Sequence, residues 1–268
     1  MGFLINPYLV QPSGPSYDAD AQAFFTAAGI TDTTQKSAVN QLVLDLKSYS
    51  IWTKMKALYP FVGGTSTTHS YNLKNTAQYQ LTFNGGGTHA STGWTPNGTN
   101  GYANTGLIPS TSLTKFSEHF SLYSRTNNKR DVFNGARQGG AQATSVALRS
   151  TDAPNGAFYF WSYCWTCSSI YVNNTDSSGL FLVTDRASND REAYRNGSSI
   201  ASNTYDMTPY DQTSIEMYLA SNNVNGTATG FDNKELAFAS LGDGLTDTEA
   251  ANFYTAVQTF QTTLSRSV

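Results

Sequence analysis

The sequence predicts an all-β fold, an antiparallel sandwich with a short helical region at its N-terminal end and an amphipathic helix at its C-terminal end. Between about residues 61 and 243, short runs of aromatic and β-branched residues alternate with clusters of Gly, Asn, Ser and Thr, the pattern of short strands joined by tight turns. The chain of 268 residues has 16 Tyr and 15 Phe but only 13% charged residues. Its last third has the order strand, hairpin, strand, strand, helix, which favours a sandwich of antiparallel sheets.

The first 17 residues contain three prolines and are expected to form an extended arm. The apolar start of this arm should dock either on its own domain or on a larger assembly. It lacks the basic segment of a signal peptide, so export is not expected.

Three short helices are expected to follow the arm. The first would begin at Asp18 or Asp20, either of which can serve as N-cap, and would end at Gly29, beyond the last turn. The second would begin at Asp32, and the third would lie between Ser50 and Pro60, where proline stops a helix. Each has a single apolar face, so the three must pack on something larger.

The expected strands are 79–83, 119–125, 144–149, 157–163, 169–172, 179–185, 192–195, 199–201, 214–220 and 235–241. Asn196-Gly197 predicts a type I′ hairpin, because both central residues of that turn need positive φ. A closing helix over 247–264 would be capped by Thr246 together with Glu249. The chain therefore divides into an arm (1–17), a helical region (18–60) and a sandwich with its closing helix (61–268).

Composition excludes some classes of partner. The net charge is −3, so there is no basic surface for a nucleic acid. No segment approaches the roughly 18 apolar residues of a transmembrane helix, so membrane insertion is not expected.

Several segments resemble the concanavalin A-like (laminin G-like) jelly roll, namely 120–125, 194–197, 215–219, 231–240 and 242–250. Segments 57–64 and 96–103 suggest a further resemblance. Over about residues 18–265 the chain resembles virion proteins of tailed bacteriophages that carry this jelly roll. The resemblance implies a tail, fibre or head-surface protein, located on the virion. It also implies three kinds of partner. Other virion proteins would bind the arm, further copies of the chain would form an oligomer, with a trimer possible, and host-surface carbohydrate would be the ligand.

Catalytic carboxylates are not predicted. Glycosidases on such folds use paired carboxylates on one face of a strand, about 5–9.5 Å apart, and no Glu-x-Asp-x-x-Glu motif is present. Asp190 and Glu192 come nearest to a pair, but with Arg186 they are expected to form ion pairs at a strand end. Glu118 and Glu216 have no partner in sequence. The chain is therefore not expected to be an enzyme.

No metal and no cofactor is predicted. The three histidines are isolated in sequence, without the spacing of a zinc site. Asp185, Asn189 and Asp190 supply oxygen atoms at close spacing, but they do not form an EF-hand pattern.

Cys164 and Cys167 frame Trp165 and Thr166. A redox role would need a helix N-terminus in a βαβ setting, whereas this motif follows an expected strand. A disulfide that pins a hairpin loop and a pair of free thiols both remain open.

Trp94, Tyr163 and Trp165 are the candidates for a sugar-stacking platform, because aromatic rings combine an apolar face with polar edges. Arg186 is a further candidate contact. Trp161 is assigned to the core, whereas Trp94 and Trp165 are expected to lie in loops. The favoured hypothesis is a non-enzymatic virion protein that binds host-surface glycan. The alternatives are a glycan-degrading enzyme on the same fold and an architectural decoration protein without a ligand.

Overall fold

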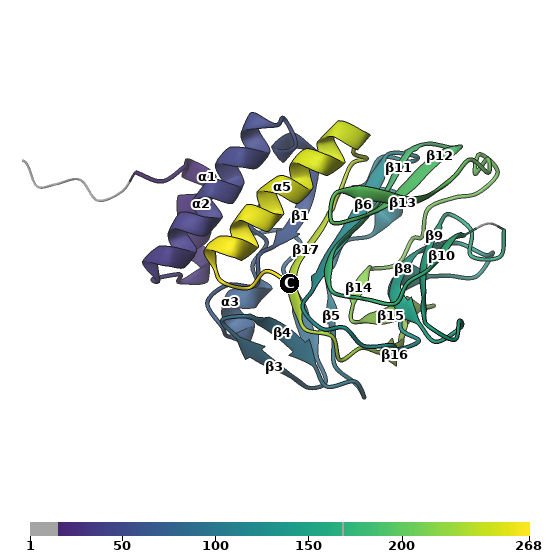
Figure 1. Ribbon diagram of the computed structural model, residues 1–268, viewed down its shortest axis with the longest axis horizontal. Helices are drawn as coiled ribbons and strands as arrows, with labels where there is room; N and C mark the ends of the chain where they lie inside the picture. The colour runs from purple at the N-terminus through teal and green to yellow at the C-terminus, as the bar shows by residue number, and fades with distance from the viewer. Residues whose placement is uncertain (1–15, 168) are drawn as a thin grey trace, which may run out of the picture.

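The computed structural model describes residues 16–167 and 169–268. Two β-sheets face each other, and a layer of helices covers the outer face of one of them (Figure 1). The predicted all-β sandwich with helices at both ends of the chain is confirmed. The expected arm lies outside the described residues, except for Ser16 and Tyr17. No helix in the described part of the chain is long and apolar enough to cross a membrane.

The first sheet, sheet A, has eight strands in the order β13-β12-β11-β6-β17-β4-β3, with β1 paired to β17. Its pairings are all antiparallel, as predicted. The strands are β1 (Met55–Tyr59), β3 (Gly87–Ala90), β4 (Gly93–Pro96), β6 (Glu118–Ser124), β11 (Gly179–Ala187), β12 (Asp190–Arg195), β13 (Ser198–Asn203) and β17 (Leu236–Gly242).

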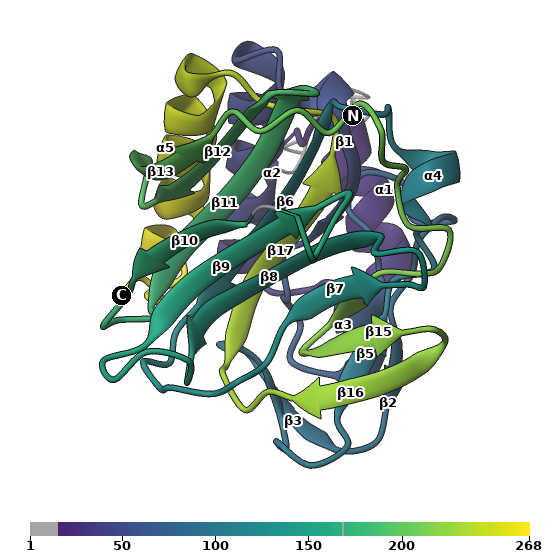
Figure 2. The ribbon, with the colours of Figure 1, turned by 90° about the vertical axis from the view of Figure 1, so that its right-hand side faces the viewer.

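The second sheet, sheet B, has nine strands in the order β10-β9-β8-β7-β14-β5-β2, and β15 with its partner β16 joins at β7 (Figure 2). The β15–β7 pairing is parallel and departs from the predicted antiparallel arrangement. The strands are β2 (Thr82–Asn84), β5 (Tyr102–Asn104), β7 (Asn134–Arg137), β8 (Ala143–Ser150), β9 (Ala157–Ser162), β10 (Ile170–Asn173), β14 (Tyr218–Leu219), β15 (Ser221–Val224) and β16 (Thr227–Phe231).

One hydrophobic core fills the space between the sheets. Alternate residues of each strand point into it, because side chains alternate across a strand. Sheet A contributes Phe120, Leu122, Phe181 and Val183, and sheet B contributes Val146, Leu148, Phe158 and Phe160.

A second core lies between sheet A and the helices α1 (Ala19–Ala28), α2 (Thr33–Ser48) and α5 (Asp247–Thr263). Tyr123, Leu180 and Phe238 from the outer face of sheet A pack there against the apolar faces of the helices. Sheet A is therefore covered on both faces. The outer face of sheet B has no such layer over it among the described residues (Figure 2).

Local turn and cap signals predicted the backbone well. Gly29 follows α1 with φ +68°, and Asn196 and Gly197 both have positive φ, at +49° and +75°. Thr246 and Glu249 form the predicted capping box at the start of α5.

The predicted third helix is wrong. The segment has a single 3₁₀ turn, Trp52–Lys54, and then becomes strand β1, which pairs with β17. Met55, Ala57, Leu58 and Tyr59 are all fully or nearly fully buried, because β1 lies between the helices and the inner core. A short apolar run of this kind fits a buried helix and a buried strand equally well. The strand expected over 214–220 is also much shorter, since only Tyr218–Leu219 is strand.

Candidate functional site

The four predicted glycan-contact residues do not come together. Trp94 lies in β4 and not in a loop, and its side chain is 1% exposed. It packs between Phe61 and Phe83 in the inner core, so it offers no face to a ligand. Its strand is short and lies between glycine- and threonine-rich turns, which is why the sequence predicted a loop.

Tyr163 is also a core residue, with 1% of its surface exposed. Its hydroxyl oxygen accepts a hydrogen bond from the backbone N–H of Phe116 at 2.6 Å, and burial raises the pKa of the phenol. The ring packs against Phe116 and lies in a small cluster with Cys164 and Met207. Tyr163 therefore anchors the loop after β9 and is not a contact for sugar.

Arg186 is the centre of an ion-pair network at the N-terminus of α5. Its guanidinium donates to Asp190 at 2.6 and 3.0 Å, to Glu192 at 2.7 Å and to Asp247. The Tyr194 hydroxyl and Arg186 both bond the Asp247 carboxylate and lower its pKa. Asp190 and Glu192 are thus ion-paired at a strand end, as the sequence predicted, and Arg186 has little donor capacity left for a ligand.

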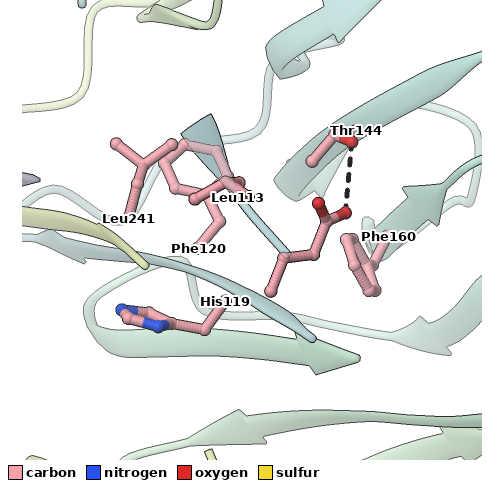
Figure 3. A pocket seen from close by; sticks show the side chains of 7 residues that line it. Leu113, His119, Phe120, Thr144, Phe160 and Leu241 are labelled. Atoms are coloured by element: carbon pink, nitrogen blue, oxygen red, sulfur yellow. Dashed lines mark hydrogen bonds between the residues drawn. The ribbon is translucent and has the colours of Figure 1, made fainter. Parts of the chain in front are cut away.

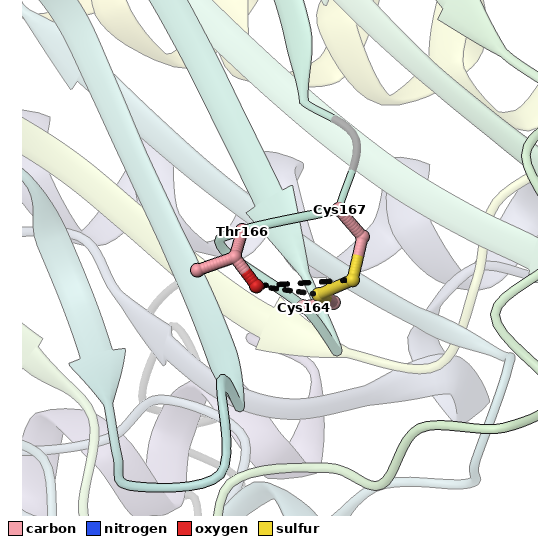
Figure 4. Close-up of a disulfide and its surroundings, with 3 residues drawn as sticks. All are labelled: Cys164, Thr166 and Cys167. Carbon is pink, nitrogen blue, oxygen red and sulfur yellow. Dashed lines mark hydrogen bonds between the residues drawn. A yellow bond between two sulfur atoms is a disulfide. The ribbon is translucent and has the colours of Figure 1, made fainter.

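Trp165 is exposed, with 38% of its surface in solvent. The Cys164–Cys167 disulfide closes the loop that carries it (Figure 4). Its backbone N–H donates to Ala141 O at 2.9 Å, so the loop is held against the turn between β7 and β8. The guanidinium carbon of Arg137 lies 4.5 Å from the centre of the indole ring.

The uncovered face of sheet B carries a continuous group of rings, Phe133, Tyr159, Trp161 and Tyr171, which we call the aromatic row. Ring centres are 4.3 Å apart for Phe133 and Trp161, 5.3 Å for Trp161 and Tyr159, and 5.0 Å for Tyr159 and Tyr171. Tyr171 is 49% exposed, and the other three are half-buried.

Strand register builds this row. Tyr159 pairs with Tyr171 across β9 and β10, and residues directly opposite share one face of a sheet. Phe158 and Phe160 alternate with Tyr159 and point into the core. The prediction that Trp161 lies in the core is wrong for this reason. Because both faces of β9 carry aromatic residues, the sequence alone does not distinguish its inner face from its outer one.

Arg137 lines two hollows, the first of which is also lined by Phe133 of the aromatic row. The first, about 330 Å³, is bounded by Phe133, Asp131, Asn222 and Thr229. The second, about 170 Å³, is bounded by Trp165, Gln138 and Asn225. The described face of sheet B therefore offers flat rings, shallow depressions and polar side chains on one surface.

A buried carboxylate pair is the feature that the sequence did not reveal. Glu118 on β6 and Asp185 on β11 are register partners, 2% and 0% exposed. Glu118 accepts a hydrogen bond from Thr144 at 3.3 Å (Figure 3) and another from Gln212 at 2.9 Å. Asp185 accepts one from Ser162 at 2.9 Å. Burial raises the pKa of Glu118 to about 7, and burial with the neighbouring Glu118 charge raises the pKa of Asp185.

The pair lies between the sheets and is enclosed. The space beside Glu118, lined by Leu113, Phe120 and Leu241, does not admit a water molecule. The buried guanidinium of Arg191, the register partner of Asp185, favours one negative charge there. Two carboxyl groups and one guanidinium therefore share this buried position, a composition that suits a structural cluster.

No protein-family model matches the chain, and no curated protein matches it in sequence. Solved structures share its fold. Botulinum neurotoxin type C, described as interacting with two ganglioside molecules, aligns with a TM-score of 0.55 at 11% identity over 79% of this chain and 53% of the toxin chain. The sialidase of Trypanosoma rangeli aligns with a TM-score of 0.50 at 10% identity over 82% of this chain and 39% of the enzyme. The chain thus spans about half or less of these two proteins. Similarity at this level shows the fold alone, a jelly-roll β-sandwich.

Proposed function

We propose that this protein binds carbohydrate through the outer face of sheet B. The observation that carries the proposal is the aromatic row on a sheet face over which residues 16–167 and 169–268 place no covering layer. Burying large rings against a core is the usual outcome of folding, and the outer face of sheet A is buried in this way. Sheet B instead leaves Phe133, Tyr159, Trp161 and Tyr171 partly in solvent. A pyranose ring has an apolar C–H face that stacks on such rings, while its hydroxyl groups reach polar side chains around them.

Trp161→Ala is expected to weaken polysaccharide binding by about tenfold or more, since a central ring of an interface contributes at least about 1.4 kcal/mol. Binding would be found on a glycan array and its dissociation constant measured by titration calorimetry. The matched control is Tyr205→Ala, which removes a 46% exposed ring from the loop that follows β13 of sheet A and does not belong to the aromatic row. Equal affinities of wild type and Trp161→Ala would contradict the proposal, and a null array would favour a purely architectural protein.

The finer proposal is that the protein is a structural component of a tailed-bacteriophage virion, a tail, fibre or head-surface protein, and self-associates there. Its support is the resemblance of the sequence segments described above. The apolar faces of α1, α2 and α5 pack on sheet A, so any attachment to the particle would fall to the arm.

Deleting residues 1–15 is expected to abolish incorporation into particles and to leave the sandwich folded. Tyr17 is kept in this variant, because its ring packs edge to face on Phe25 at 5.1 Å. Incorporation would be measured by immunoblotting of purified particles, and folding by circular dichroism. Normal incorporation of the truncated protein would refute the anchoring role.

We further propose that the protein is not an enzyme. In support, Asp190 and Glu192 are ion-paired to Arg186, and Glu118 and Asp185 are enclosed between the sheets. Release of reducing ends from a bound polysaccharide, lost in Asp190→Asn or Glu192→Gln, would instead establish a glycan-degrading enzyme.

A further inference from the structure

We propose that Arg137 and Trp165 form a subsite for an acidic sugar, in which Arg137 binds the carboxylate and Trp165 packs beside the sugar ring. This inference deepens the proposed function and rests on it. It assigns the ligand to one chemical class, polysaccharides that contain uronic or other carboxylate-bearing sugars.

Arg137 is placed on the binding face by the register of sheet B. Within β7, Asn134 and Ala136 are buried, whereas Arg137 is half-buried and lies opposite Ala143 of β8 and Val224 of β15. Among the arginines of the described residues, it alone has neither a hydrogen bond nor an ion pair from its guanidinium group. The other arginines bind carboxylates, amide oxygens or backbone carbonyls, as Arg149 and Arg195 do. The five N–H donors of Arg137 are therefore available to a ligand.

Trp165 orients this guanidinium. The guanidinium carbon lies 4.5 Å from the centre of the indole ring, a distance at which the cation is attracted to the ring face, and Arg137 lines both hollows. The disulfide and the bond from Trp165 N–H to Ala141 O hold the indole in place. The planar guanidinium of Arg137, held in this way, can donate two parallel N–H bonds to the two oxygens of a carboxylate.

The two hollows differ in charge, and the difference gives the ligand a direction. The first hollow contains the Asp131 carboxylate, which repels an anion. The second contains Gln138 and Asn225, whose side-chain oxygens already accept bonds from Ser214 and Gly139 N–H, both at 2.9 Å. Their amide N–H groups remain as donors. The carboxylate of the sugar therefore sits on the Trp165 side of Arg137, and neutral sugars extend along the aromatic row.

The test compares polymers that differ only in charge. Polygalacturonate and hyaluronate would each be titrated against wild type, alongside their carboxyl methyl esters. Wild type is expected to bind at least one acid form about tenfold more tightly than its ester, and Arg137→Gln to remove that preference with little change for the ester. Lys129→Gln, which removes one positive charge from an exposed loop lysine bonded to Pro154 O, should keep the preference.

Wild type that binds neither acid form more tightly than its ester would overturn the subsite, as would an unchanged preference in Arg137→Gln. Binding of the esters that depends on Trp161 would then still uphold the proposed function. If the protein binds no polysaccharide of any charge, both proposals fail together. Thermal unfolding of each variant shows whether a loss of binding comes from a loss of folding.

Discussion

Arg266→Leu is expected to lower the free energy of unfolding by about 3–5 kcal/mol, a large part of the stability of a typical domain. Arg266 is 1% exposed. Its guanidinium donates to Phe61 O at 2.9 Å, Pro60 O at 3.1 Å and Ala237 O at 3.2 Å. Burial lowers the pKa of the side chain to about 9, so it stays charged at neutral pH. Leucine would remove the donor to the buried Phe61 and Pro60 carbonyl groups, whereas Ala237 O would keep its bond from Gln261 Nε2 at 3.2 Å. Urea unfolding followed by circular dichroism measures the loss.

The same arginine joins parts of the chain that are far apart in sequence. Its Nε donates to Gln261 Oε1 at 2.9 Å, which ties the end of α5 to the end of β1 and to β17. Arg130→Leu is the matched control, because that partly exposed guanidinium bonds Gly98 O at 2.8 Å and its loss should cost about 1 kcal/mol. If Arg266→Leu were as stable as wild type, the cost of burying the charge would equal the value of its hydrogen bonds.

Features set by neighbouring residues were predictable from the sequence. The Asn196-Gly197 turn and the capping box of Thr246 and Glu249 depend on a few consecutive residues, and the structure has both. The strand-rich middle of the chain was predictable for a similar reason. Its short runs of aromatic and β-branched residues favour strands wherever the rest of the chain lies.

Features set by strand pairing were not predictable. The aromatic row needs β9 beside β10 and Phe133 beside β9, and the sequence does not specify that register. The same holds for Glu118 and Asp185, which are far apart in sequence and become neighbours only when β6 pairs with β11. Burial of Trp94 depends on β4 joining β17. Of the four contact residues predicted from the sequence, Trp165 is therefore the one that is exposed and lies against Arg137 beside the proposed binding face.

The buried carboxylate pair is expected to make the folded state less stable as the pH rises from about 4.5 to about 7. In the unfolded chain Glu118 loses its proton near its ordinary pKa of 4.5, whereas in the folded protein burial raises this pKa to about 7. Between these values the folded state binds more protons than the unfolded state, so the free energy of unfolding falls with rising pH. Below about pH 4.5 this stabilisation is fully present. As the pH rises to about 7 the protein loses it, and the free energy of unfolding falls by about 3 kcal/mol.

Glu118→Gln removes the titration of Glu118 together with its charge beside Asp185, because glutamine keeps the shape of the side chain and does not titrate. The rotating Thr144 hydroxyl can accept a bond from the new amide, while Gln212 still donates to the remaining oxygen. His119 and His69 act in the opposite sense, since burial lowers their pKa values to about 4 and about 3 and stability from them rises with pH. The difference between variant and wild type removes the histidine contribution. Urea unfolding of both proteins would be measured between pH 4.5 and 7.5. Over this range the free energy of unfolding of Glu118→Gln, relative to that of wild type, should rise by up to about 3 kcal/mol. A difference that does not change with pH would show that the pair carries no extra proton in the folded state.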